Sequence, residues 1–187
     1  MITSTAVGGP ADITGLIAKW KFICTKPKDF FATMPTEGGM QDPVTFYAAI
    51  SVVNAVGALL IGIMHPMQAV VQAIIVLILM MAVSFIATAI TFGLSKLFGG
   101  TGNYEATYRA YSYATAPGVL GWVPLIGVFT GLYSLYMLKM GLERAQGLTP
   151  GKAIAVIAVQ VGIAVVIGVI VAMVGAAAVM VGGGLGR

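Results

Sequence analysis

Four long stretches of this chain contain no Asp, Glu, Lys or Arg, and the few charged residues are crowded between them. The uncharged stretches are residues 44–64, 67–95, 110–138 and 153–186. A hydrocarbon core about 30 Å thick selects apolar runs of this length, because charge inside it is costly. Only helices and closed barrels satisfy the backbone inside lipid, and runs of continuous apolar residues favour helices. The pattern therefore predicts an all-α, polytopic membrane helical bundle.

Turn signals divide the uncharged stretches into five transmembrane helices. We place Pro117 and Gly118 in the turn between the third and fourth helices, because both residues interrupt a helix. Pro124 and Pro150 are placed in the first turn of the last two helices, where a missing N–H costs nothing. The expected spans are at about residues 44–64, 67–95, 104–117, 123–142 and 152–182.

Basic residues alternate between the gaps that separate these spans, and this alternation predicts an orientation. The turns at residues 65–66 and 118–122 have no Lys or Arg, whereas the other gaps before the last span are basic. By the positive-inside rule the N-terminus is cytoplasmic and the C-terminus external. The rule also favours a true crossing by the short segment 104–117, because a re-entrant segment would place residue 147 outside. The basic gaps hold Lys19, Lys21, Lys26 and Lys28, then Lys96 and Arg109, then Lys139, Arg144 and Lys152.

Residues 1–43 form a cytoplasmic N-terminal arm that contains an amphipathic helix, and residues 44–187 form the transmembrane domain. Asp12 is the expected N-cap of the arm helix. The helix is expected to lie in the lipid headgroup layer, to pack on the protein's own helices, or to dock a partner. Lys19, Trp20 and Lys21 are its candidate partner-binding or headgroup-binding residues. Its apolar face is Ile13, Leu16, Ile17, Trp20 and Ile23, at helical spacing.

The segment YEATYRAYSYATAPG, residues 104–118, is the most polar part of the predicted membrane domain. Glu105 and Arg109 are four residues apart in the order that favours a helical ion pair. One interpretation is a partner or lipid-headgroup site formed by Tyr104, Glu105, Tyr108 and Arg109. The other is a structural clamp in which the paired charges and the tyrosines join helices.

Composition narrows the function classes further. Hydrophobic residues make up 59% of the chain and charged residues 9%, against about 45–50% and 25% in soluble domains. Cys24 and His65 each stand alone, so we expect no disulfide, no metal site and no cofactor. The net charge is +4, and the basic residues lie in the gaps between the predicted spans, as they do in membrane proteins. We therefore expect no nucleic-acid partner.

Several landmarks occur in a characteristic order: KPKDFFATMP, GGMQDPVTF, the tyrosine-rich segment with VLGWVPLIG after it, and LYSLYMLKMGLERAQGLTPGKAIAV. In this order they resemble the Yip family, the Ypt/Rab-interacting five-span membrane proteins. The resemblance implies a cytoplasmic N-terminus, an external C-terminus, and roles in vesicle traffic and membrane shaping. The short arm makes the chain more similar to compact prokaryotic members, which implies a prokaryotic cell membrane. The alternative is the endoplasmic reticulum or Golgi membrane.

These residues bear on three classes of function: enzyme, transporter or channel, and non-catalytic scaffold. The sequence offers no nucleophile with a base, no carboxylate pair and no metal set, so we expect no enzyme. A small-solute transporter or channel subunit remains the alternative, since polar residues inside the spans could line a path for an uncharged solute. These residues are Asn54, Thr88, Ser112, Thr115 and Gln160. We expect a non-catalytic scaffold or adaptor that acts through a cytoplasmic protein partner, membrane organisation or trafficking. Small-residue spacings such as Gly127-x-x-x-Gly131 also allow a homo-oligomer in the bilayer.

Overall fold

The computed structural model describes residues 13–184, and all regular structure within that range is helical. The expectation of an all-α fold is confirmed. The predicted N-cap Asp12 lies outside the described residues. The elements, in chain order, are α1 Ile13–Thr25, α2 Pro27–Thr33, α3 Gln41–Ile61, α4 Pro66–Leu97, α5 Tyr104–Ala114, the 3-10 helix η1 Ala116–Leu120, α6 Pro124–Gln146 and α7 Pro150–Gly184.

Four of these helices, α3, α4, α6 and α7, are long and apolar enough to cross a membrane. Helix α4 has 32 residues and a length of about 48 Å, more than a bilayer core about 30 Å thick. Helix α5 has 11 residues, about 16 Å of helix, and is not among the four. The fifth crossing at residues 104–117 therefore stays a prediction.

Helix ends follow local sequence signals. Helix α2 begins at Pro27 and ends at Thr33, two residues before Pro35. The side chain of Asn103 caps α5 by accepting a hydrogen bond from the backbone N of Ala106 at 2.7 Å. Gly147 ends α6 with φ of 65°, a left-handed conformation that favours glycine.

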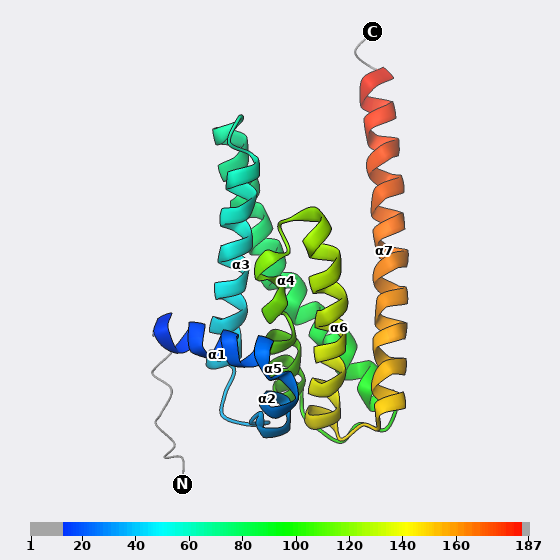
Figure 1. Cartoon of the computed structure of the whole chain (residues 1–187). Helices are drawn as coiled ribbons and strands as arrows, with labels where there is room; N and C mark the ends of the chain where they lie inside the picture. Colours follow the sequence, from blue (N-terminus) through cyan, green and yellow to red (C-terminus); the bar gives the residue numbers. More distant parts are fainter. Residues whose placement is uncertain (1–12, 185–187) are drawn as a thin grey trace.

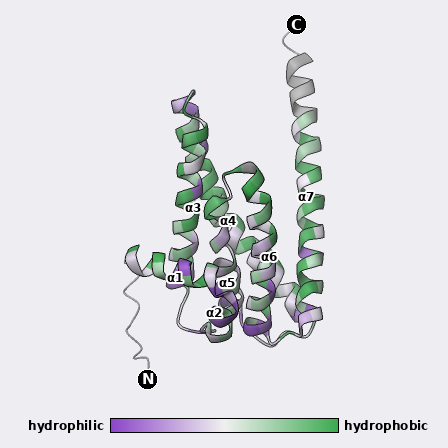
Figure 2. Ribbon diagram, viewed as in Figure 1, coloured by the Kyte–Doolittle hydropathy of each residue, from purple (hydrophilic) through white to green (hydrophobic). Residues whose placement is uncertain are grey.

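The long helices run up and down, and the short helices α1, α2 and α5 lie toward one end of them (Figure 1). The described Asp, Glu, Lys and Arg residues fall in three segments, residues 19–42, 96–109 and 139–152, which we call the charged end. Figure 2 shows hydrophobic residues along α3, α4, α6 and α7, with hydrophilic residues gathered at the charged end and at the tip of the α3–α4 hairpin.

The packed core lies toward the charged end and joins the arm to the bundle. It includes Ile23 of α1, Phe31 of α2, Phe46 of α3, Tyr113 of α5 and Met137 of α6, each almost fully buried. Away from this end only the α3–α4 hairpin and the far half of α7 continue, and these two parts stand apart (Figure 1). Residues 164–176 of α7 are exposed on every side, as a lipid-facing helix would be.

Candidate functional site

Helix α5 lies at the centre of the charged end, although its sequence is the most polar of the bundle. Eight of its 11 residues are buried, and the side chain of Arg109 is only 3% exposed. The helix packs on α3, α4 and α6. A buried arginine is stable only when its charge is paired and its donors are satisfied. The partners of Arg109 therefore show which segments this region holds together.

Arg109 and Glu105 together hold the loop that leads from the arm into α3. The Nε atom of Arg109 donates to Oε1 of Glu105 at 3.1 Å, and its Nη2 atom donates to the carbonyl oxygen of Gly39 at 2.6 Å. The backbone N of Gly39 in turn donates to Glu105 Oε1 at 2.7 Å. Gly38 and Gly39 have φ of 122° and 88°, values that L-residues with side chains rarely adopt. The ion pair thus fixes both backbone groups of one glycine.

Asp42, at the start of α3, forms a second connection between the same elements. Its Oδ2 atom accepts a hydrogen bond from the Tyr113 hydroxyl of α5 at 2.6 Å. Its Oδ1 atom pairs with the ammonium group of Lys19 in α1, which also lies 5.7 Å from the centre of the Tyr113 ring. One carboxylate therefore ties α1, α3 and α5 together. We call Lys19, Asp42, Glu105, Arg109 and Tyr113, with the Gly38–Gly39 loop, the polar clamp.

Helix α1 is held on one side and exposed on the other. The Trp20 indole Nε1 donates to the carbonyl oxygen of Ala116 at 2.8 Å, and Ile23 is fully buried. Ile13 and Ile17 are 72% and 58% exposed. The helix thus packs on its own bundle along part of its apolar face and leaves the rest of that face free.

The residues predicted as a partner or headgroup site do not share one surface. Lys19, Glu105 and Arg109 belong to the polar clamp, and Lys21 is exposed. Tyr108 is fully buried, with its ring centre 4.8 Å from that of Phe85. The Tyr104 hydroxyl donates to the Phe85 carbonyl oxygen at 3.1 Å. Partner or headgroup binding by these residues stays a prediction.

Sequence reasoning missed Asp42, Tyr113 and the Gly38–Gly39 loop as members of the clamp. The glycine pair was readable as a turn, and Asp42 as an acid at a helix start. Their partners on α5 and in the loop are 66 to 71 residues away in the chain, and Lys19 is 23 residues from Asp42. No local spacing reveals such pairs.

The predicted turn prolines lie where helices begin or bend. Pro117 and Gly118 are in η1, between α5 and α6, and Pro124 and Pro150 are the first residues of α6 and α7. The amide of Asn54 on α3 donates to the Gly118 carbonyl oxygen at 2.8 Å, which fastens this turn to the first long helix.

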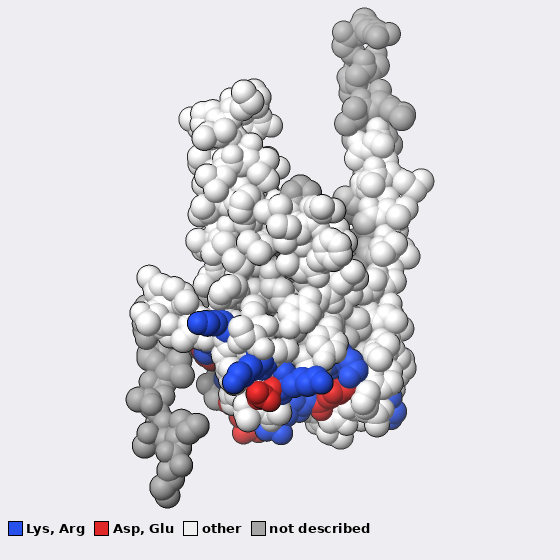
Figure 3. All heavy atoms as spheres, in the orientation of Figure 1, with Lys and Arg blue, Asp and Glu red and all other residues white. Residues whose placement is uncertain are grey.

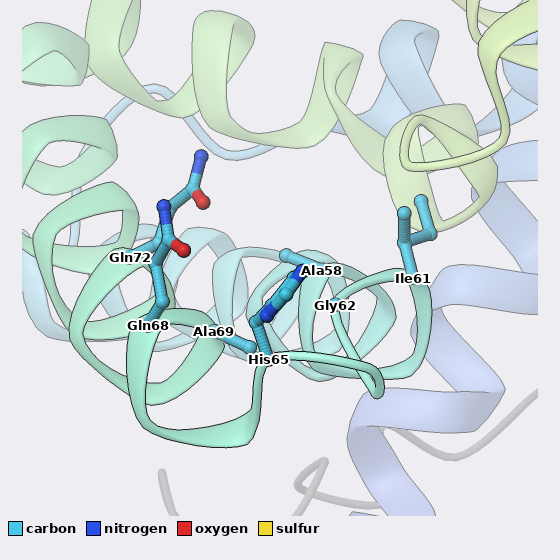
Figure 4. A pocket seen from close by; sticks show the side chains of 7 residues that line it. All are labelled: Ala58, Ile61, Gly62, His65, Gln68, Ala69 and Gln72. Carbon is cyan, nitrogen blue, oxygen red and sulfur yellow. The ribbon is translucent and has the colours of Figure 1, made fainter.

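The remaining described side chains that could react or bind a metal do not form a cluster. Among the described residues no group of three His, Cys, Asp or Glu side chains could hold a metal ion. Burial raises the pKa of the Cys24 thiol to about 11. At the opposite tip of the molecule, residues from the end of α3 and the start of α4 line a cavity of about 350 Å³. There His65 leans over Ala58 and Gly62, while Gln68 and Gln72 project side by side from α4 (Figure 4).

The four long apolar helices and the charge confined between their ends define an integral membrane protein of the helical class. The Yip1 domain matches the chain over residues 20–179, from the middle of α1 to the far part of α7. The chain therefore belongs to the Yip1 family, and the resemblance seen in its sequence is confirmed. Searches among curated proteins and among solved structures gave no match.

Proposed function

We propose that this Yip1-family protein is a non-catalytic membrane scaffold that organises the bilayer and its partners from a cytoplasmic charged end. The proposal rests on one observation, namely that the described charged residues all lie at one end of the molecule. Figure 3 shows Lys, Arg, Asp and Glu gathered on this face at the charged end, while the rest of the described surface in this view is drawn white, as uncharged residues. Members of the Yip1 family are generally non-catalytic.

The positive-inside rule supports the cytoplasmic location of this end. Nine Lys and Arg residues lie in the three segments of the charged end, against five Asp and Glu residues. Loops rich in Lys and Arg stay on the cytoplasmic side. The hairpin formed by α5, η1 and α6 returns to the charged end whether or not its turn reaches the outer surface. The segment 139–152 then lies on the same side as the arm, and we propose that this side is the cytoplasm and that the C-terminus is external.

The shape of the molecule supports a role in membrane organisation. At the charged end the arm helices and α5 widen the bundle, whereas the opposite end consists of the α3–α4 hairpin and α7 (Figure 1). Exposed Ile13 and Ile17, with Lys21 nearby, suit an α1 that lies in the headgroup layer. A protein that is wider in the cytoplasmic leaflet than in the outer one expands that leaflet and favours its outward curvature.

The polar clamp supports an adaptor role by making the cytoplasmic surface a fixed one. It fastens the arm, the loop before α3 and the short helix α5 to each other. Little ordering cost then remains when a partner protein binds. Exposed Lys21 and Lys152 are the residues through which we expect such a partner, or a second copy of the chain, to be contacted without disturbing the clamp.

The test is isolation of the tagged full chain in native-membrane nanodiscs, followed by identification of every protein that stays bound. We expect a stoichiometric partner that is lost from the Lys21→Ala/Lys152→Ala variant and retained by a Gly93→Ala control. Helix content measured on both variants separates loss of binding from loss of folding. A homo-oligomer that carries no partner and conducts an uncharged solute through vesicles would contradict the scaffold and favour a transporter or channel.

A further inference from the structure

A basic groove between α2 and α6 stands apart from the polar clamp. It is a cavity of about 480 Å³ lined by Lys28 and Phe31 of α2 and by Tyr136, Lys139, Met140 and Arg144 of α6. A second cavity of about 430 Å³ shares Lys28 and Tyr136 with it and adds Lys26. The two cavities are adjacent, since they share these two residues, and together we call them the α2–α6 groove.

Positive charge predominates around this groove. Lys26, Lys28, Lys139 and Arg144 line it, against Asp29 and Glu143. Glu143 is already paired with Lys139 at 2.8 Å. Arg144 uses its Nε atom to donate to the Met34 carbonyl oxygen at 3.3 Å, and no other bond of its guanidinium is found in the described chain. Within the same part of the chain, Lys26 and Lys28 form no ion pair. Several donors are therefore free for an anion.

The floor and the long side of the groove are apolar. Phe31 is 1% exposed and forms part of the core beneath the cations. Along α6, the residues Leu125, Phe129, Leu132 and Tyr136 are spaced by four, three and four positions, so they form one stripe on the helix. All four are exposed. The stripe from Tyr136 to Leu125 is about 16 Å long, close to half of a hydrocarbon core about 30 Å thick.

The geometry points to a binding site for one anionic phospholipid, with its phosphate among Lys28, Lys139 and Arg144 and its acyl chains along the α6 stripe. Basic pockets beside membrane helices on the cytoplasmic side are suited to anionic headgroups. Tyr136 lies at the boundary between charged and apolar surface, where its amphipathic ring is favoured. An acidic peptide would match the cations but would not cover the apolar α6 stripe, whose length suits an acyl chain. The site adds a specific ligand to the membrane scaffold proposed above and does not depend on a protein partner.

The test is native mass spectrometry of the full chain in neutral detergent micelles. The probe is an equal mixture of phosphatidylglycerol and phosphatidylcholine with the same acyl chains. We expect one retained phosphatidylglycerol per chain, in preference to phosphatidylcholine. Lys28→Gln/Arg144→Gln should lower this preference about 25-fold, at about fivefold for each cation removed. The single variants Lys28→Gln and Lys96→Gln each remove one charge from the same end. Lys96 lines neither cavity, so only Lys28→Gln should lower the preference, about fivefold.

Any of the following outcomes would refute the proposed phospholipid site. Equal loss in Lys28→Gln and Lys96→Gln would assign the preference to overall charge. Displacement of the lipid by an excess of glycerol phosphate would show a site for soluble phosphate, and displacement by a poly-glutamate peptide would show a site for an acidic protein segment. Should the double variant lose helix content, Lys28→Gln alone decides the question, since no ion pair holds that side chain; an unchanged preference in it would refute the assignment.

Discussion

Replacing Arg109 by alanine removes the central residue of the polar clamp and should destabilise the whole charged end. The substitution deletes the hydrogen bonds to Glu105 and to the Gly39 carbonyl oxygen. It also leaves Glu105 without its cation beside a loop whose two glycines have positive φ. The matched control is Arg144→Ala, which removes an exposed arginine with a single bond at 3.3 Å to backbone.

The size of the effect follows from burial. Breaking a buried charge pair costs about 3–5 kcal/mol, and a hydrogen bond to a charged group contributes about 1.5–3 kcal/mol. The Glu105 side chain is 26% exposed, so water can solvate part of the carboxylate that is left behind. We therefore expect Arg109→Ala to lower the free energy of unfolding by about 2–4 kcal/mol, and Arg144→Ala by less than about 1 kcal/mol.

The assay is reversible unfolding of the full chain in mixed micelles, followed by helix content as the denaturing detergent is increased. A double-mutant cycle with Glu105→Ala should give a coupling energy of at least about 1 kcal/mol. Capture of the partner or lipid is measured separately on the folded fraction. Arg109→Ala that is as stable as Arg144→Ala, yet has lost its capture, would refute the clamp and make Arg109 a binding residue.

Three further predictions test the packing of the charged end. Gly102→Ala should destabilise the protein by about 3 kcal/mol or more in the same unfolding assay, because its Cβ would collide with the Ala145 carbonyl oxygen. The control Gly93→Ala, where the space is open, should be neutral or slightly stabilising. Trp20→Phe loses the 2.8 Å bond to Ala116 and should speed amide hydrogen exchange of α1 about fivefold, while unchanged exchange would show that this bond does not hold the arm. The raised pKa of Cys24, about 11, should slow its labelling by maleimide at neutral pH on the order of a hundredfold relative to a free thiol, and labelling at the free-thiol rate would contradict its burial.

The long helices could be predicted from sequence because a bilayer imposes one rule on every residue in it. Uncharged runs of sufficient length, ended by prolines and glycines, predicted α3, α4, α6 and α7 to within a few residues. The apolar spacing of the arm likewise predicted α1. Helix α5 was harder, because a segment of 11 residues that is polar and buried obeys neither the rule for a span nor that for a surface helix.

The connections of the clamp could not be predicted because they depend on how distant segments pack. The pairing of Glu105 with Arg109 was readable from their spacing of four residues, and it is present at 3.1 Å. The attachment of that pair to Gly39, and of Tyr113 to Asp42, requires α5 to lie against the start of α3. Sequence spacing carries no information about that approach without a set of related sequences.

The central claim is that a cytoplasmic end with more helices than the outer end lets this protein organise a bilayer. Its most direct test is electron cryomicroscopy of vesicles reconstituted with the full chain at rising protein-to-lipid ratio. The orientation is read from labelling of Thr149→Cys in a Cys24→Ser background by an impermeant maleimide. With the charged end outward, the account predicts vesicle diameters that fall steadily as protein is added. Diameters that stay equal to those of protein-free vesicles at every ratio would contradict it.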